Sequence, residues 1–416
     1  MINKWVPRGL IAVSFGLLAS IGSAGERSYT FYDIGVFGCP EDAYTVPTDL
    51  TDTGVVTGTS STADCSTGHA FTWVNGIMTD LDEYYEEGIF FGVQAISQTE
   101  ILLGYGTPDQ VLARICDGRV FPLPVPPECE MQGHSRGIND TGTMAVGSCD
   151  TNGQGVLAPA VYWIEDGTAL ALDLLPGLPE DASGEGRDVN DDGVVIGVVD
   201  GEQRAFMWQD GVLTEIFNGL GGEGVVANAI NNHGLIVGLA GTTDDFPAMS
   251  YDMNTGVMTV LGTGAAHDVN DRGSAVGRDI IDFIATHVIL YENGEAIDLS
   301  PFFPPALADV NRANAINNYG WIVGWADDTI GRMHGWLLVP IYDKGDYDGD
   351  TDVDHQDFQH FQRCFAAEPY PNGTLHVGCS VFDFDDDVDL DLDDYAAFQS
   401  AFTGPTAPNN NPNGPG

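Results

Sequence analysis

The chain has 416 residues, of which 43% are hydrophobic and 53 are glycine, so it is long enough for several cores and rich in turns. Its 62 acidic residues against 14 basic ones give a net charge of −48. Such a chain repels nucleic acid and anionic membrane surfaces, which excludes both as expected partners. An acidic surface suited to a salty medium is an equally good explanation of the charge.

Residues 1–24 have the pattern of a secretory signal peptide. Lys4 and Arg8 form a positive region, Gly9–Ala19 is an apolar stretch too short to span a bilayer, and Gly22-Ser23-Ala24 is a small-residue cleavage site. No later apolar stretch is long enough for a transmembrane helix. We therefore expect a mature protein that is cleaved near Ala24, has no membrane insertion, and is secreted to the exterior or the cell surface.

The seven cysteines are then expected to meet an oxidising compartment. Their odd number leaves one unpaired or joined to another chain. Because no CxxC pair with metal-ligand spacing occurs, disulfides are the favoured interpretation. The expected pairs are Cys364–Cys379 and, on weaker grounds, Cys116–Cys129 and Cys39–Cys65.

A short phrase recurs along most of the chain, with its clearest copies at Ala227–Gly238 (ANAINNHGLIVG) and Ala313–Gly324 (ANAINNYGWIVG). An apolar residue is followed by Asn, two polar residues and Gly, and then by a short apolar run that ends at another Gly. Since Asn caps a turn and Gly accepts a positive φ, each copy predicts a strand, a tight turn and a second strand. In the second copy Glu100 takes the place of the turn glycine. Copies start at residues 50, 96, 138, 189, 230, 269 and 316.

A second phrase falls between copies of the first, as in His69–Leu81 (HAFTWVNGIMTDL) and Arg204–Ile216 (RAFMWQDGVLTEI). It predicts a strand, a two-residue turn, and a strand that ends in an acidic and an apolar residue. Asn-Gly and Asp-Gly favour such hairpins because both central residues must take positive φ. The predicted turns are Asn75-Gly76, Asp117-Gly118, Asp166-Gly167, Asp210-Gly211 and Asn293-Gly294, with Thr255-Gly256 a weaker relative.

Two hairpins per repeat of roughly 40–50 residues are typical of one blade of a β-propeller. Seven repeats predict an all-β fold with seven blades. The last repeat lacks its final strand, and Tyr29–Gly35 has the same acid-apolar ending, so the N-terminal strand is predicted to complete the last blade and close the ring. A six- or eight-bladed ring and an open β-solenoid are the alternatives. Trp73, Trp163 and Trp208 occupy equivalent strand positions and are interpreted as inter-blade packing.

These phrases resemble the repeats of the HAF family of probable extracellular proteins, which is named for the His-Ala-Phe found here at His69-Ala70-Phe71. The resemblance covers about residues 29–340. It implies secretion and a repeat fold, and it implies no established activity.

The C-terminal stretch contains two copies of an acidic loop, thirty-seven residues apart, each followed by a segment with aromatic residues at helical spacing (Asp357–Phe365 and Asp394–Phe402). Alternating acids that open a helix match the oxygen cage that Ca²⁺ requires. A disordered acidic linker is the alternative, and metal binding is expected to supply folding energy to the module. The expected ligands are Asp346, Asp348, Asp350, Asp354 and Asp357 in the first loop and Asp383, Asp385, Asp387, Asp391 and Asp394 in the second, with Asp352 and Asp389 contributing main-chain carbonyls.

This paired loop and helix, at about residues 342–404, resembles a type I dockerin. The resemblance implies a cohesin-like scaffold or a cell-surface protein as partner. In that family, loop positions 10 and 11 help to select the partner, and here they are His355-Gln356 and Leu392-Asp393. Position 6, usually Gly, is Thr351 in the first loop and Val388 in the second, and these residues resist a positive φ.

We therefore expect a signal peptide (1–24), a HAF-repeat propeller (25–341), a small α-helical, dockerin-like calcium module (342–404) and a disordered tail (405–416). The favoured function is a secreted, non-catalytic propeller that binds a ligand or partner, with carbohydrate as one candidate ligand in polysaccharide utilisation. The alternatives are a carbohydrate-active hydrolase or lyase and a structural cell-surface component.

Catalytic candidates have little support from the sequence. Gly133–Gly137 matches the G-x-S-x-G nucleophile pattern around Ser135, but no helix follows it as that pattern requires. A group of acids could supply the paired carboxylates of a glycosidase, but an exposed loop between blades is the favoured interpretation. That group is Asp80, Asp82, Glu83, Glu86 and Glu87.

Overall fold

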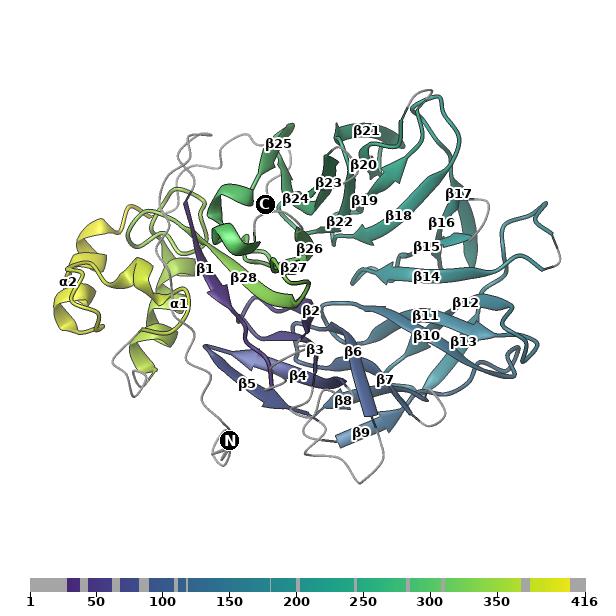
Figure 1. Cartoon of the computed structure of the whole chain (residues 1–416), viewed down its shortest axis with the longest axis horizontal. Helices are drawn as coiled ribbons and strands as arrows, with labels where there is room; N and C mark the ends of the chain where they lie inside the picture. The colour runs from purple at the N-terminus through teal and green to yellow at the C-terminus, as the bar shows by residue number, and fades with distance from the viewer. Residues whose placement is uncertain are drawn as a thin grey trace.

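The computed structural model of the chain describes residues 28–37, 44–61, 68–81, 90–107, 111–116, 119–179, 181–199, 203–242, 245–281, 285–307, 311–367 and 375–404. Within these residues, 28 strands form seven antiparallel four-stranded sheets arranged as the blades of a propeller (Figure 1). The prediction of a seven-bladed, all-β propeller is confirmed. The predicted signal peptide and C-terminal tail lie outside the described residues.

Each blade takes four consecutive strands, except the last. Blade 1 contains β2 (Thr45–Leu50), β3 (Val56–Ser61), β4 (Gly68–Val74) and β5 (Ile77–Asp80), and blade 2 contains β6 (Phe90–Ile96), β7 (Leu102–Thr107), β8 (Val111–Cys116) and β9 (Arg119–Pro122). Blade 3 contains β10 (Met131–Ile138), β11 (Met144–Asp150), β12 (Leu157–Trp163) and β13 (Thr168–Ala171), and blade 4 contains β14 (Gly184–Val189), β15 (Val195–Val199), β16 (Arg204–Gln209) and β17 (Val212–Ile216). Blade 5 contains β18 (Val225–Ile230), β19 (Leu235–Ala240), β20 (Ala248–Asp252) and β21 (Val257–Gly262), and blade 6 contains β22 (Ala265–Val269), β23 (Ala275–Ile281), β24 (Ala285–Glu292) and β25 (Glu295–Asp298).

Blade 7 joins the two ends of the propeller. It contains β26 (Asn311–Ile316), β27 (Ile322–Asp327), β28 (Met333–Ile341) and, as its outermost strand, β1 (Ser28–Asp33) from the N-terminus. Asp33 pairs with Trp336 and Phe31 with Leu338. The predicted closure is therefore confirmed, and it removes the exposed edge that β28 would otherwise present.

The apolar residue that starts each copy of the first phrase ends the first strand of a blade, from Leu50 in blade 1 to Ile316 in blade 7. The turn glycine takes a positive φ in six copies, for example 79° at Gly234. In the remaining copy, in blade 2, Glu100 takes the place of this glycine and adopts φ 62°. This conformation costs a residue with a Cβ about 1 kcal/mol or more. The phrase therefore dictates the turn even where glycine is missing.

The hairpin prediction is correct at Asn75-Gly76, Asp210-Gly211 and Asn293-Gly294, where both residues have positive φ. It is wrong in detail at Asp166-Gly167, because only Gly167 has a positive φ and its amide bonds to the carbonyl of Trp163, which makes a four-residue turn. Thr255-Gly256 has the same wider form, with the Gly256 amide on the Asp252 carbonyl. Asp117-Gly118 lies outside the described residues.

Hydrogen bonds between neighbouring turns run around the ring. The backbone amide of Asn232 donates to the side-chain oxygen of Asp271, and the backbone amide of Asp271 donates to that of Asn318. The backbone amide of Asn318 in turn donates to the carboxylate of Asp52, and each of the three distances is 2.8 Å. The circuit continues through Gln98, the Asp140–Thr141 pair and Asp191 back to Asn232. Each blade is therefore bonded to the next, and the two polar residues that precede each turn glycine include the group that makes this bond.

The second phrase supplies a polar pair across the outer hairpin of a blade. His69 Nδ1 lies 2.9 Å from Asp80, His287 Nδ1 lies 2.9 Å from Asp298, and Arg204 pairs with Glu215 at 2.6 Å. In blade 7, His334 lies 3.6 Å from Asp33 of the N-terminal strand. The acid of the acid-apolar ending is thus the partner of the first residue of the phrase, so His69 and His334 have a structural role in their blades.

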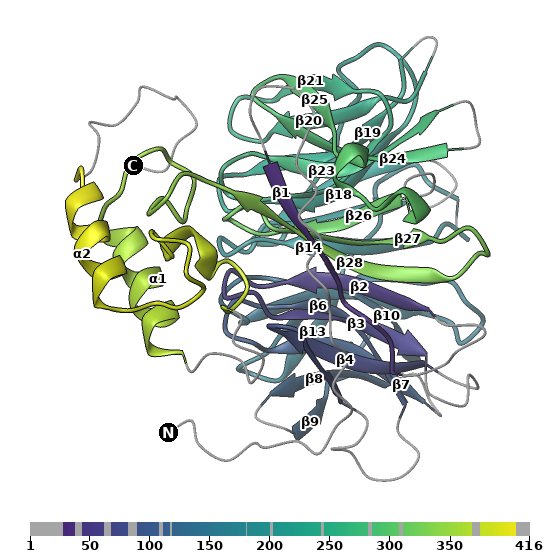
Figure 2. The ribbon, with the colours of Figure 1, turned by 60° about the vertical axis from the view of Figure 1, so that its left-hand side comes forward.

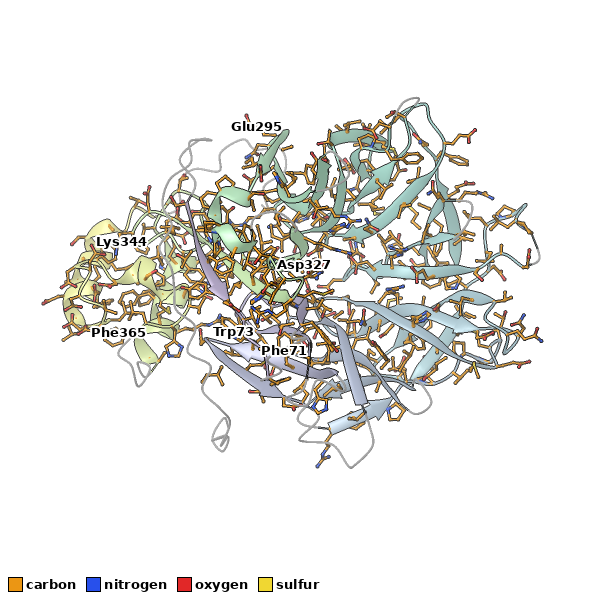
Figure 3. The ribbon with its side chains drawn as sticks, in the orientation of Figure 1. Phe71, Trp73, Glu295, Asp327, Lys344 and Phe365 are labelled. Carbon is orange, nitrogen blue, oxygen red and sulfur yellow. A yellow bond between two sulfur atoms is a disulfide. The ribbon has the colours of Figure 1, made fainter. Side chains whose placement is uncertain are left out.

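Aromatic side chains fill the spaces between blades. Trp73 is 1% exposed and Phe71 is fully buried in blade 1 (Figure 3), and Trp163 of blade 3 meets Trp208 of blade 4 edge to face at 6.4 Å. Inter-blade packing is therefore confirmed for these tryptophans. Large rings at this position bring the hydrophobic contribution that a radial arrangement of small sheets needs.

Two disulfides lie within the described residues. Cys364–Cys379 is present as predicted. The predicted Cys116–Cys129 pair is wrong, because Cys129 is bonded to Cys149. Cys129 lies two residues before β10, where Gln132 pairs with Cys149 of β11. Cys116 ends β8 of another blade and forms no disulfide with any described cysteine. Cys39 and Cys65 lie outside the described residues. Disulfides persist in oxidising compartments. Among the described helices, none has the length and apolar character needed to cross a membrane.

The C-terminal residues form a small helical module beside the propeller (Figure 2). It contains α1 (His355–Ala366), the short 3₁₀ helix η4 (Cys379–Phe382) and α2 (Leu392–Ala401). Phe361, Phe382 and Phe398 are each at most 2% exposed and form the centre of its core. This core is continuous with that of blades 1 and 7 through Tyr347 and Trp321, so the module is packed on the propeller.

Candidate metal centre

The first acidic loop, Asp346–Asp357, folds around its own carboxylates. Asp346 accepts hydrogen bonds from the amides of Gly349 and Thr351, at 2.6 and 3.0 Å. Asp357 accepts from the amides of Tyr347 and Asp354, at 2.7 and 2.8 Å. The first and last acids of the loop therefore hold it closed, with their remaining oxygen lone pairs available to a cation.

The second loop, Asp383–Asp394, closes in the same way, with one difference: its first acid accepts from loop positions 5 and 6, whereas that of the first loop accepts from positions 4 and 6. Asp383 accepts from the amides of Asp387 and Val388, and Asp394 accepts from those of Phe384 and Asp391. Position 6 of both loops has a left-handed backbone, with φ 75° at Thr351 and 70° at Val388. The β-branched residues therefore adopt the conformation that glycine would normally supply.

Carboxylate oxygens converge in both loops. Within each of four groups, one oxygen from every member lies within 4.8 Å of the others. The groups are Asp346, Asp348 and Asp357; Asp352, Asp354 and Asp357; Asp383, Asp385 and Asp394; and Asp389, Asp391 and Asp394. All-oxygen donor sets of this density suit a hard cation such as Ca²⁺, so the residues fit the ion that the spacing predicts.

Four of the predicted ligands have additional or different roles. Asp354 and Asp391 cap α1 and α2, accepting from the amides of Gln356 and Asp393 at 2.7 Å in each case. Asp350 and Asp387 lie outside the convergent groups of the described residues, and each accepts from the amide two residues later. The loop residues thus divide into convergent carboxylates and carboxylates that also shape the loop.

The two loops differ in their surroundings. The carboxylates of the first loop are mostly buried, with Asp346, Asp348 and Asp357 only 4%, 3% and 1% exposed. Those of the second are mostly exposed, although Asp383 and Asp394 are buried. Burial raises the pKa of Asp346 to about 6, and burial followed by the neighbouring acids raises that of Asp348 to about 7, against the opposing effect of Arg272.

The first loop is buried because it lies against the turns of the propeller. Arg272, in the turn between β22 and β23, donates to the carbonyl of Asp348, and its guanidinium lies 3.7 Å from that carboxylate. Tyr319, in the turn between β26 and β27, packs on Tyr347 with ring centroids 5.2 Å apart and its hydroxyl lies 2.9 Å from His360. Sequence reasoning missed these contacts, since no sequence pattern in the turns of blades 6 and 7 indicates that the module packs on them.

A cavity with a volume of about 340 Å³ lies between the module and blade 7. Its aromatic lining comes from both parts, with Tyr32 and Trp321 from the propeller and Tyr347 from the module. Lys344, which Figure 3 labels, lines it too and donates to the carbonyls of Ser380 and Asp383 and to the carboxylate of Asp386. This lysine ties the segment that enters the module to the second loop.

The central channel of the propeller is a separate acidic feature. Asp49, Asp188 and Asp268 line a cavity of about 110 Å³, and each carboxylate accepts from the amide of the next residue and from an amide of the following blade. Burial raises the pKa of Asp188 to about 8 and that of Asp268 to about 6. These acids precede the apolar residue in three copies of the first phrase, and that spacing could have revealed them.

The catalytic candidates of the sequence are not supported by the geometry. Ser135 is 3% exposed and lies inside β10, with no helix after it, so the pattern around it is not a nucleophile elbow. Asp80 is engaged with His69. Asp82, Glu83, Glu86 and Glu87 lie outside the described residues.

No protein-family model matches this chain, and no curated protein matches it. Among solved structures it is similar to the oligogalacturonate lyase from Vibrio parahaemolyticus, at 12% identity over 79% of this chain and 96% of that chain, with a TM-score of 0.51. It is also similar to virginiamycin B lyase from Staphylococcus aureus (13% identity, 76% and 100% covered, TM-score 0.46) and to the β-propeller domain of the Trilobed protease from Pyrococcus furiosus (9% identity, 71% and 93% covered, TM-score 0.44). At such identities the likeness shows the propeller fold alone.

Proposed function

We propose that this chain is a secreted, calcium-dependent binding protein, in which a HAF-like propeller is linked to a dockerin-like module that attaches it to a cohesin-like scaffold or a cell-surface protein. The observation that carries the proposal is the pair of aspartate loops, which share ligand spacing, closing hydrogen bonds, helix caps and a left-handed position 6. Two copies of one cage, each opening a helix, favour a selected metal site over an acidic linker.

The module has an outward surface suited to a partner. The residues at loop positions 10 and 11, His355, Gln356, Leu392 and Asp393, are all exposed. Leu392 is 71% exposed, and Phe365 and Phe402 are 42% and 37% exposed, so apolar side chains accompany these polar ones. Isolated exposed apolar residues are common, but several on one small module suit a protein interface.

In this proposal Ca²⁺ would be held by the convergent carboxylates of each loop, and it would neutralise their mutual repulsion. The chain's own residues do the rest: the loop amides orient Asp346, Asp357, Asp383 and Asp394, and the caps fix the first turns of α1 and α2. The module then presents a rigid surface while the propeller remains accessible to its own ligand.

The test is a pull-down from secreted extract with the full chain as bait, in Ca²⁺ and in EDTA. We expect a partner that is retained in Ca²⁺, released by EDTA, and lost on Leu392→Asp but not on Val257→Asp, which alters an exposed apolar residue of β21 on the propeller. Retention that does not depend on Ca²⁺ or on Leu392 would contradict attachment through the module. Cleavage of a polysaccharide by the purified chain, by hydrolysis or by elimination, would replace the non-catalytic proposal with the enzyme alternative.

A further inference from the structure

Basic residues are scarce in this chain, and most of those described have a carboxylate partner. The chain has 14 Lys and Arg residues against 62 acidic ones. Glu185 serves both Arg136 and Arg187, and the other pairs are Arg204–Glu215, Arg272–Asp348, Arg332–Asp328 and Lys344–Asp386. In so acidic a protein, a partly buried arginine with no carboxylate partner is unexpected.

Arg278 and Arg312 are such residues. Both are partly buried, and within the described part of the chain neither forms an ion pair. The Nε atom of Arg312 is buried, and no described residue accepts a hydrogen bond from it. Three other arginines have no carboxylate partner among the described residues. Arg119 and Arg363 are exposed to water, and the partly buried Arg114 lies over the ring of Phe121, 4.9 Å from its centroid.

The two arginines lie on strands that pack against each other between blades 6 and 7. Arg278 lies in β23, opposite Ala265 at the start of β22, and Arg312 lies near the start of β26. β23 packs against β26, and both residues lie toward the face of the propeller opposite the turns on which the module sits. Burial and then the charge of Arg278 lower the pKa of Arg312, so the two cations repel each other across this junction.

The neighbouring histidine adds no charge to offset or increase this repulsion. His267 Nδ1 lies 2.8 Å from the carbonyl of Ala313, and burial, followed by the charge of Arg312, lowers the pKa of His267 to about 3. It is therefore neutral at physiological pH. The junction thus contains two guanidinium groups and one neutral imidazole, and the Nε–H of Arg312 is a buried donor without an acceptor among the described residues. A bound anion would stabilise this arrangement.

We propose that Arg278 and Arg312 bind one small oxyanion, a carboxylate or sulfate group of a ligand at the face of the propeller opposite the module. Guanidinium groups match such planar or tetrahedral oxyanions through paired N–H donors. The net charge of −48 disfavours a long polyanion, so the ligand is expected to carry one such group on a small or otherwise neutral molecule. This site is independent of the calcium loops and goes beyond the proposed attachment.

The proposal is tested by thermal shift and calorimetry of the full mature chain with sulfate, acetate and glucuronate, at an ionic strength held constant with sodium chloride. We expect a saturable rise in Tm with at least one of these probes. Arg312→Gln and Arg278→Gln are each expected to weaken its binding by about tenfold or more. Arg119→Gln, which removes an exposed arginine of β9, is the matched control and is expected to bind as the wild type does.

A readout without ligand separates binding from structure. If the two arginines serve to bind an anion rather than to stabilise the fold, Arg312→Gln and Arg278→Gln are expected to leave Tm unchanged or to raise it in chloride buffer. The reason is that each substitution removes one of two charges that repel each other. Absence of a saturable effect from all three probes would overturn the proposal, and so would equal binding by wild type and both variants. A lower Tm of both variants in chloride, with binding retained, would assign the two residues to packing.

Discussion

The two aspartate loops have the same ligand spacing and similar closing hydrogen bonds, but one is buried against the propeller and the other faces solvent. In the first, Asp348 is 3% exposed and receives a hydrogen bond from Arg272 of blade 6 at its carbonyl. In the second, the corresponding Asp385 is exposed. The difference shows that the loop sequence determines the cage, whereas the surroundings determine how each cage responds to protons, to metal and to mutation.

The largest expected effect is the loss of a closing acid. Asp357→Asn is expected to remove the calcium of the first loop and its stabilisation of the docked module. At a calcium concentration one hundredfold above Kd this amounts to about 2.7 kcal/mol. Calorimetry should then find one calcium per chain, and thermal unfolding should begin at a lower temperature.

Asp394→Asn makes the same change in the exposed loop. It is also expected to leave one calcium per chain, but with a smaller loss of stability, because the first loop and its contacts with Tyr319 remain. Asp343→Asn, which changes an exposed acid outside the loops, is the control for charge. Equal losses of stability in the two loop variants would mean that burial against the propeller has no energetic consequence.

The pH dependence of calcium binding is the next largest effect. Two carboxylates of the first loop, with pKa values of about 6 and 7, must each lose a proton before metal binds. Calcium affinity of this loop is expected to fall on the order of a hundredfold between pH 7.5 and 5.5, and that of the exposed loop to fall less. Calorimetry in buffers of different ionisation enthalpy measures the protons released.

Calcium-free protein should show the opposite trend in stability. Since the pKa of Asp346 and Asp348 is higher in the folded chain than in the unfolded one, the folded state binds more protons between about pH 4 and 7. Its stability therefore falls as the pH rises through that range. A stability of the calcium-free protein that increases steadily from pH 5 to pH 7.5 would argue against the burial of these carboxylates in the folded chain.

Arg272 and Lys344, the basic residues that contact the two loops, are expected to differ less in their contribution to stability. Arg272→Gln leaves the buried Asp348 without its charged partner, so in calcium-free buffer it is expected to destabilise the protein by about 1–2 kcal/mol. Lys344→Gln removes a pair between groups that are 40% and 79% exposed, and it is expected to cost less than about 1 kcal/mol. Urea unfolding of the two variants without calcium measures the difference, and a larger cost for Lys344→Gln would reverse the comparison.

The smallest expected effect concerns position 6 of each loop. Thr351 and Val388 are exposed and have φ 75° and 70°, so glycine at either position relieves backbone strain without loss of packing. Thr351→Gly and Val388→Gly are each expected to strengthen calcium binding a few-fold, equivalent to about 1 kcal/mol. Glu100→Gly relieves the same strain in the propeller and is expected to stabilise the fold equally with and without calcium.

The sequence predicts local features of this molecule well because they depend on a few residues close together. The position of every inner strand follows from the apolar-Asn-x-x-Gly phrase, and closure by Tyr29–Gly35 follows from the missing strand of the last repeat. The spacing of the aspartates indicates where carboxylates converge, although Asp350 and Asp387 lie outside the convergent groups of the described residues. The Asp166-Gly167 turn was predicted with the wrong length because a dipeptide does not determine how many residues a hairpin loop contains.

The missed features depend on contacts between distant residues. Cys129 is bonded to Cys149 rather than to Cys116 because Cys129 lies just before β10, which pairs with the strand that contains Cys149, and cysteine spacing does not contain this register. The seat of the module on Arg272 and Tyr319 joins segments that are far apart in the chain. Its consequences, a buried first loop and an exposed second one, could not be derived from two loops with the same spacing of aspartates.

Hydrogen–deuterium exchange of the full chain, with and without Ca²⁺ at pH 7.5, tests most directly whether calcium in the first loop holds the module on the propeller. We expect calcium to slow exchange in both loops and also in the propeller turns that contain Arg272 and Tyr319. Slower exchange in the loops alone would contradict the coupling between the first loop and the propeller. Exchange that calcium leaves unchanged throughout residues 346–394 would contradict the calcium sites themselves.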